Sequence, residues 1–310
     1  MLPLVEKYRP QKIADCVLPK GIKSTFEGIV QTGEIPNMIL AGGAGCGKTT
    51  VARAMCSELG ADYMFINASE DGGIDTLRTK IRNFASTVSL GGGKKVIILD
   101  EADYLNSNTT QPALRGAIEE FAANCRFIMT CNYKARIIDP LHSRCTVIDF
   151  KIPVKEKPQL AGEFLQRAKS IMEVEGIKYE EKAVAELIIR YFPDFRRILN
   201  TIQKHSISGS IDSSVLATGK DIDIDQLIKA MGSKSFNDIR KWVVENSDNE
   251  PATIFRRIYD GLQERMNPGS IAQAILILGE YQYKAAFVAD QELNLVACCL
   301  MLASDCSFNK

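Results

Sequence analysis

The sequence predicts an α/β domain with a parallel five-stranded sheet, followed by two helical domains. Three observations support this prediction. Short apolar segments without alternating polarity recur through residues 1–150, and helical patterns separate them. One of these segments leads into a glycine-rich loop, which a helical pattern follows at once. From about residue 156 to the end of the chain, the apolar residues recur at helical spacing alone.

The expected strands are five apolar segments, which in chain order are Met38–Leu40, Tyr63–Asn67, Val96–Asp100, Phe127–Cys131 and Thr146–Phe150. Their continuous apolar character indicates burial on both faces, which is typical of a parallel sheet covered by helices. In such sheets, ligands bind at the carboxyl ends of the strands. Polar residues that follow these ends are therefore the first candidates for a functional site.

Helices are expected over residues 158–174, 180–192 and 195–204, and a further run of helices over 235–304. Gly176 ends the first of them, and Asp194 is the expected N-cap of the third. The expected domains are residues 1–150, 151–230 and 231–310.

The composition is that of an ordinary soluble globular protein, with 310 residues, 45% hydrophobic and 25% charged. Lysine plus arginine equals aspartate plus glutamate, 38 against 38, which excludes a globally basic surface for nucleic acid. No apolar segment approaches the roughly 18 residues of a membrane span, and we expect neither membrane attachment nor a signal peptide. Nine scattered cysteines without a C-x-x-C pair argue against a zinc site and fit reduced thiols in a cytosol.

The segment Gly42–Thr49 matches the phosphate-loop pattern G-x-x-x-x-G-K-[ST]. Its glycines allow several N–H groups to point at one phosphate chain, at the positive end of the helix that follows. Lys48 supplies a cation for the β- and γ-phosphates, and the Thr49 hydroxyl can bind Mg²⁺. A chance glycine-rich loop would lack this strand–loop–helix context. The expected nucleotide-binding residues here are Gly42, Gly45, Cys46, Gly47, Lys48, Thr49 and Thr50.

An acidic pair follows the third expected strand, in the sequence Val96–Asp103. Asp100 can hold Mg²⁺ and Glu101 can polarise an attacking water. Many strands end in solvated acids, but this pair lies in the same α/β domain as the phosphate loop. Asn132 ends the next strand, where its amide could orient the water or touch the γ-phosphate; alternatively, it is a turn-forming residue. Arg144 precedes the fifth strand and, by itself, could be an ordinary surface arginine.

The ordered motifs resemble the clamp-loader branch of the AAA+ ATPases, which includes replication factor C small subunits and the large subunit of T-even-type phage clamp loaders. The matching segments are Glu6–Pro10, Gly42–Thr49, Asp100–Asp103, Cys131-Asn132, Ser143–Cys145 and Pro193–Arg196. The phosphate loop and the acidic motif are general in AAA+ proteins, whereas the first and fifth segments are more specific. Residues 206–310 resemble the family only in length and helical pattern.

The resemblance implies roles for particular residues. The two helical domains would be a lid and an oligomerising collar. Asn132 would be sensor 1, Arg196 sensor 2, and Arg144 an arginine finger in the neighbouring subunit's ATP site. Asn67 matches the position of a residue that restrains the catalytic glutamate. The adenine would be enclosed by Glu6, Lys7, Tyr8, Arg9 and Val17.

The resemblance also implies contacts with duplex phosphates from two helices. The first, Asp75–Ser86, carries Arg78, Lys80 and Arg82, and the second carries Gln111 and Arg115. A solvated charged surface is the alternative for each residue. Gly116 departs from the cellular pattern, which has a second arginine there.

The implied function is that of an ATPase subunit of a sliding-clamp loader, with ATP and Mg²⁺ as cofactors. Its partners would be other loader subunits in a pentamer, the sliding clamp and primer–template DNA, in the cytoplasm of a cell or of a phage host. One alternative is another AAA+ machine, a branch-migration helicase or initiator loader, which predicts a winged-helix C-terminus. The other is a non-hydrolysing scaffold of the same fold. Such a scaffold usually lacks the lysine, glutamate or arginine at these motif positions, whereas this chain has Lys48, Glu101 and Arg144.

Overall fold

The computed structural model describes residues 2–70, 73–87, 95–207, 209–212, 224–247, 249, 251–262 and 265–308. Its contacts divide the chain into two compact units, Met1–Val215 and Leu216–Lys310. None of the helices in these described ranges is long and apolar enough to cross a membrane.

The first unit is built on a five-stranded parallel sheet with the strand order β2-β3-β4-β1-β5. The strands are β1 (Met38–Ala41), β2 (Tyr63–Asn67), β3 (Lys95–Asp100), β4 (Cys125–Cys131) and β5 (Thr146–Asp149). This confirms the predicted sheet. Ala41 pairs with Cys131, and Leu99 with Met129, so the ends of β1, β3 and β4 meet at one edge. The phosphate loop, the acidic pair and Asn132 all begin at that edge.

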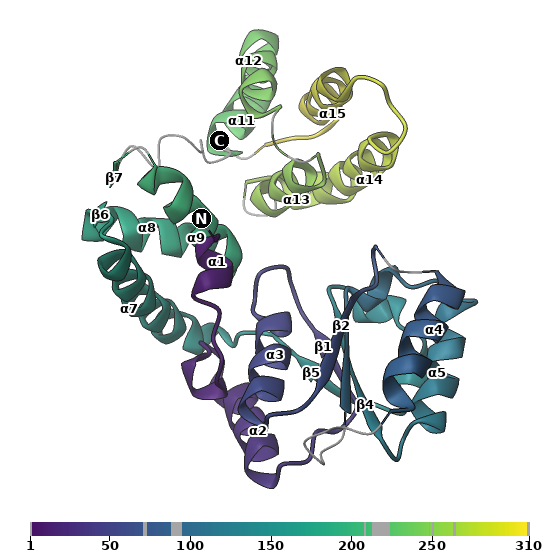
Figure 1. Cartoon of the computed structure of the whole chain (residues 1–310). Coiled ribbons are helices and arrows are strands. Elements are labelled where there is room, and N and C mark those ends of the chain that lie inside the picture. The colour runs from purple at the N-terminus through teal and green to yellow at the C-terminus, as the bar shows by residue number, and fades with distance from the viewer. Residues whose placement is uncertain are drawn as a thin grey trace. The chain divides into compact units, whose positions relative to one another are not determined.

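Helices cover both faces of the sheet (Figure 1). One face carries α2 (Lys20–Thr32) and α3 (Lys48–Glu58), which share a core with Met38, Leu40 and Ile98. The other carries α4 (Ile74–Ala85), α5 (Thr110–Glu120) and α6 (Asp139–His142), which share a core with Ile39 and Ile97. Alternate residues of β1, β3 and β4 therefore enter opposite cores, as the continuous apolar segments predicted, whereas the edge strands β2 and β5 are buried on one face only. Short 3-10 turns are η1 (Ile13–Asp15), η2 (Ala102–Tyr104), η3 (Lys134–Arg136) and η4 (Val154–Glu156).

The lid consists of α7 (Lys157–Glu175), α8 (Glu181–Tyr191) and α9 (Phe195–Ser206). The predicted signals act as expected: α7 ends at Gly176, with φ 67°, and the Asp194 side chain accepts a hydrogen bond from Arg197 N. A small parallel pair, β6 (Lys178–Tyr179) and β7 (Ser210–Ile211), was not predicted. The N-terminal helix α1 (Leu4–Lys7) lies against α9, and Leu4 is buried in the lid core (Figure 1).

The second unit is helical in its described ranges, and its helices share one core around Trp242. They are α11 (Ile224–Gly232), α12 (Phe236–Asn246), α13 (Pro251–Leu262), α14 (Pro268–Lys284) and α15 (Gln291–Asp305). Helix α11 spans the predicted boundary after residue 230 and packs against α12, α13 and α15. The three-domain division therefore stays a prediction, and contacts alone give the two units above.

Candidate nucleotide-binding site

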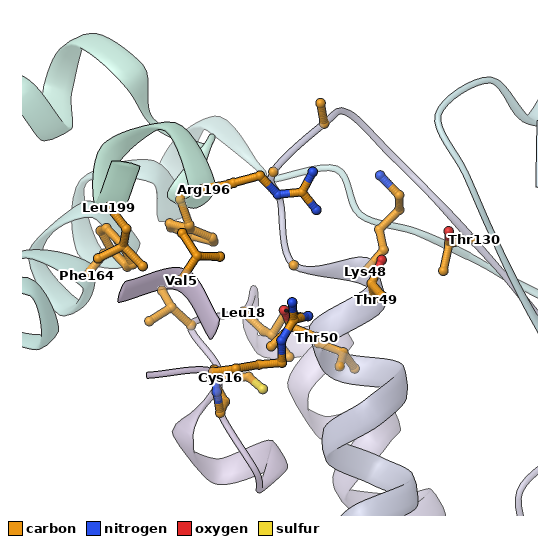
Figure 2. Close-up of a pocket in the computed structure, with 18 of the residues that line it drawn as sticks. Val5, Cys16, Leu18, Lys48, Thr49, Thr50, Thr130, Phe164, Arg196 and Leu199 are labelled. Carbon is orange, nitrogen blue, oxygen red and sulfur yellow. Dashed lines mark hydrogen bonds between the residues drawn. The ribbon is translucent and has the colours of Figure 1, made fainter. Parts of the chain in front are cut away.

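A pocket at the carboxyl edge of the sheet contains most of the predicted phosphate-binding residues (Figure 2). The loop enters α3 through Gly45 and Gly47, with φ of 71° and 95°, conformations that favour glycine. Lys48 Nζ donates hydrogen bonds to the carbonyl oxygens of Gly42 and Gly43, each at 2.7 Å, and to Asn132 Oδ1 at 3.0 Å. The ammonium group is thereby held between the loop and the end of β4.

Two of the predicted loop residues, Gly42 and Cys46, do not line the pocket. They contact other residues of the phosphate loop and the core behind it. Gly42 supplies a carbonyl to Lys48, and its Cα lies so close to Phe150 that an added Cβ would be 2.8 Å from Phe150 Cβ. The Cys46 thiol is buried and lies 3.0 Å from Gly43 O, and burial raises its pKa. Cys46 therefore fills space behind the loop, although the sequence pattern placed it among the expected nucleotide-binding residues.

The hydroxyl and carboxylate groups predicted to hold Mg²⁺ are in contact. Thr49 Oγ1 donates a hydrogen bond to Asp100 Oδ1 at 2.6 Å. The same carboxylate oxygen accepts a second hydrogen bond from Thr130 Oγ1, also at 2.6 Å. Oxygen donors of this kind are the ligands that Mg²⁺ prefers, so Thr49 and Asp100 fit that ion.

Glu101 lines the same pocket, directly after β3. Its backbone has φ 56° and ψ 41°, the left-handed region that non-glycine residues seldom adopt. Its N–H donates to Thr130 Oγ1 at 3.1 Å, and its carbonyl accepts from Tyr104 N at 3.0 Å. Asn67, the expected restraint on this glutamate, instead accepts hydrogen bonds from the N–H and hydroxyl of Ser69.

The turn that holds Asn132 is fixed by the last acid of the Asp-Glu-Ala-Asp motif. Asp103 is 5% exposed, and its Oδ2 accepts hydrogen bonds from the N–H groups of Asn132 (3.2 Å) and Tyr133 (3.1 Å). Its Oδ1 is buried without a hydrogen-bond partner. Asp103 thus links the segment after β3 to the segment after β4.

The opposite end of the pocket is apolar and lies between the N-terminal segment and the lid. Among the predicted adenine-binding residues, Tyr8, Arg9 and Val17 line it, with Arg9 Nη1 donating to Thr50 Oγ1 at 3.4 Å. Its apolar lining also includes Val5, Leu18, Phe164 and Leu199 (Figure 2), together with Phe195.

Glu6 and Lys7 are described residues that do not line this pocket. Glu6 pairs with Arg9, whose hydrogen bond and charge lower the pKa of the Glu6 carboxyl. Lys7 Nζ lies 2.6 Å from Glu175 Oε1, which the Tyr8 hydroxyl also contacts. The Glu6–Arg9 pair lies within the N-terminal segment, and the contacts with Glu175 join that segment to the lid. Leu4, in the same segment, is buried in the lid core.

Two arginines of the lid reach the pocket. Arg196, the predicted sensor 2, extends from α9 towards the phosphate loop (Figure 2). Beside it, Phe195 N donates to Gly45 O at 3.1 Å. Arg167 of α7, which sequence reasoning missed, donates to the carbonyl oxygens of Asp15 at 2.7 Å and Tyr8 at 3.0 Å. Helical spacing predicted α7 but gave no sign of which residues face the N-terminal segment.

Arg144, a described residue, lies outside this pocket. Its guanidinium pairs with Glu119 on α5, with Nη2 at 2.6 Å from Oε1, and donates to Pro140 O at 2.8 Å. An arginine held after α6 therefore does not complete the site of its own chain in this structure.

The predicted DNA-binding residues are exposed on α4 and α5. Arg78 and Arg82 line an open groove between these helices, and Arg82 lies 3.7 Å from Glu120. Lys80 and Arg115 do not line the groove, in keeping with the different directions of neighbouring positions on a helix. Gln111, in contrast, is fully buried, with hydrogen bonds to Leu105 O, Arg136 O and Ile138 N, so its role is structural.

Similarity to known families agrees with this geometry. Residues 38–153 match the ATPase family associated with various cellular activities, and residues 156–217 match the AAA+ ATPase lid domain of the sliding-clamp-loader large subunit. The chain is 35% identical to the sliding-clamp-loader large subunit of Enterobacteria phage T4, over 97% of this chain and 96% of that protein. It is 32% identical to the replication factor C small subunit of Archaeoglobus fulgidus, over 94% of each chain.

The fold and site together define an AAA+ ATPase with a nucleotide-binding pocket. Within that class, the chain belongs to the family of sliding-clamp-loader large subunits and replication factor C small subunits. A likeness to the Holliday junction branch migration motor RuvB of Thermotoga maritima shows the fold alone, with a TM-score of 0.53, 18% identity, and coverage of 72% of this chain and 78% of that one. Family membership thus favours a clamp-loader ATPase over the branch-migration and scaffold alternatives.

Proposed function

We propose that this chain uses ATP and Mg²⁺ to open a polymerase sliding clamp and to place it around primer–template DNA, in the cytoplasm and as part of a pentamer with other loader subunits. The relatives carry the clamp-loader assignment. One observation carries the mechanism: Arg144 lies outside the pocket that contains Lys48, Asp100, Glu101 and Asn132.

Hydrolysis requires attack of water on the γ-phosphorus and cleavage of its bond to the β–γ bridging oxygen, which yields ADP and phosphate. Glu101 accepts the proton of the attacking water, and Asn132 orients that water. Lys48 places positive charge beside the transferred phosphoryl group. Thr49 and Asp100 would hold Mg²⁺, which supplies further positive charge to the phosphates when bound.

Arg196 approaches the phosphates from the lid. The adenine ring of ATP occupies the apolar end of the pocket, between the lid and the N-terminal segment. The remaining charge is supplied in trans. Arg144 of one subunit enters the ATP site of its neighbour. Its guanidinium releases Glu119 and contacts the phosphates instead. An isolated chain is therefore a poor ATPase, and assembly completes the sites.

Duplex DNA contacts the exposed cations of α4 and α5, from Arg78, Lys80, Arg82 and Arg115. Phosphate contacts of this kind give affinity without sequence specificity. The net charge of the chain is zero, which favours local basic patches contributed by several subunits rather than a uniformly basic surface.

The shared-site proposal is tested by mixing two defective subunits. Glu101→Gln removes the base but keeps its shape, and Arg144→Ala removes the trans cation. We expect each variant alone to bind ATP and to assemble without turnover, while mixtures regain partial activity at interfaces where an intact Glu101 meets an intact Arg144. Arginine fingers contribute at most roughly 10³–10⁵ in rate.

Lys182→Ala, on the exposed surface of α8, is the matched control for loss of a surface cation. If the isolated wild-type chain hydrolyses ATP as fast as the assembly, the shared site is wrong. If Glu101→Gln keeps turnover within about threefold of wild type, the role of Glu101 is wrong.

A further inference from the structure

Thr130 occupies a position that none of the sequence motifs singled out. It lies in β4, two residues before Asn132, and its side chain is 1% exposed. Because Leu99 pairs with Met129, the next residues along the parallel strands, Asp100 and Thr130, are neighbours at the carboxyl edge. The Thr130 hydroxyl therefore lies beside the end of β3, next to Asp100 and Glu101.

The Thr130 hydroxyl bonds to both acids of the motif. It donates to Asp100 Oδ1 at 2.6 Å and accepts from the N–H of Glu101 at 3.1 Å. A hydroxyl has a single donor, so the donation to Asp100 uses it completely. Thr49 Oγ1 reaches the same carboxylate oxygen at 2.6 Å, which places Asp100 between a hydroxyl of β4 and a hydroxyl of the phosphate loop.

The bond to Glu101 stabilises an unusual backbone. At φ 56° and ψ 41°, Glu101 turns away from the direction of β3, and its N–H is directed to the Thr130 hydroxyl. Left-handed conformations of non-glycine residues persist only when their surroundings hold them. Here the hydroxyl of Thr130 holds the N–H side of Glu101, and Tyr104 N holds the carbonyl side.

We propose that Thr130 is a positioning residue that fixes Asp100 and Glu101 together, so that the magnesium-binding oxygen and the base keep one geometry. The proposal rests on the roles given above to these two acids. The alternative is that Thr130 only fills the core and satisfies its own hydroxyl. The two differ in what a valine of similar shape does at this position.

Thr130→Val keeps a β-branched side chain in a strand and removes both hydrogen bonds. In calorimetry with the full chain, we expect ATP affinity in EDTA to stay within about twofold of wild type, while the gain in affinity on adding Mg²⁺ is lost. In the assembled complex, kcat should fall by roughly tenfold to a hundredfold with little change in KM, as expected of a small displacement of reacting groups.

Thr130→Ser restores the hydroxyl and should return both measurements to within about threefold of wild type. Ile128→Val is the matched control, because Ile128 lies on the same face of β4, belongs to an apolar core and has no polar group that could bond to either acid; it should leave both measurements unchanged. If the valine variant fails to fold, Thr130→Cys serves instead, since its thiol fills the space but is a weak hydrogen-bonding group.

Three results would overturn the proposal: a valine or cysteine variant with wild-type turnover, one with an undiminished effect of Mg²⁺ on ATP affinity, or a serine variant as impaired as the valine variant. Glu101→Gln in the same assay separates this proposal from the proposed function. A loss of turnover in that variant supports the base even where Thr130 proves dispensable.

Discussion

The side chains of Lys48 and Asn132 are in direct contact, with Lys48 Nζ 3.0 Å from Asn132 Oδ1. This bond joins the phosphate loop to the end of β4, the two segments predicted to surround the γ-phosphate. The same ammonium group also donates to Gly42 O and Gly43 O. A bound triphosphate therefore competes with three protein oxygens for one cation.

Lys48→Ala should abolish ATP binding, because the cation is lost and the loop carbonyls lose their shared donor. Asn132→Ala should behave differently: ATP binding is kept within a few-fold because the Lys48 cation remains, while turnover in the assembly falls because the amide that orients the attacking water is lost. Calorimetry with ATP and with ADP distinguishes these effects. Micromolar ATP binding by Lys48→Ala would contradict the assignment of the phosphate loop.

Replacing Asp103 should destabilise the first unit. In Asp103→Leu, the N–H groups of Asn132 and Tyr133, whose hydrogen bonds to Asp103 are partly buried, lose their acceptor, at a cost of at most about 1–3 kcal/mol for each group. Asp103→Asn keeps one carbonyl oxygen for these two donors and should lose less stability. Urea unfolding of the full chain, followed by a probe in the first unit, measures the difference. Equal losses in the two variants would mean that the hydrogen bonds to the turn are unimportant.

Arg167→Met should weaken ADP and ATP binding equally, because Arg167 fixes the backbone at the end of the pocket proposed to hold the adenine, away from the phosphates. The two hydrogen bonds, of about 0.5–1.5 kcal/mol each, are made within the chain, so their full loss sets an upper limit of roughly 5- to 150-fold on the loss of affinity. Turnover at saturating ATP should change little. Arg167→Lys, which keeps the charge but not the fork of donors, is the control and should be intermediate. A defect confined to ATP would show that Arg167 acts at the phosphates instead.

Arg78→Ala should reduce DNA-stimulated ATPase more than Arg82→Ala does, because the Arg82 guanidinium already faces Glu120 at 3.7 Å. Loss of one phosphate contact should weaken binding similarly for all sequences and lower the salt slope by about 0.9 for each contact. Fluorescence anisotropy at several salt concentrations measures the slope. The basal ATPase rate should not change, and Lys182→Ala on α8 should leave the DNA stimulation intact. A variant with Arg78, Lys80 and Arg82 all replaced by alanine that kept full stimulation would rule out α4.

The sequence alone determined the sheet, its strands and the chemistry of the phosphate loop, because these depend on patterns within short segments. Apolar runs without alternation indicate burial on both faces, as in β1, β3 and β4, and Gly45 and Gly47 fit a loop that needs positive φ. The clamp-loader family was also evident from short motifs such as Glu6–Pro10.

Only the tertiary structure decided which side chains meet across elements. Thr130 reaches Asp100 because the register of β3 and β4 places them side by side, and Arg167 reaches Tyr8 because the lid folds over the N-terminal segment. Gln111 is buried rather than exposed because its amide satisfies backbone groups of two loops. Such contacts join residues far apart in the chain, so their partners depend on strand register and helix packing, which no local pattern encodes.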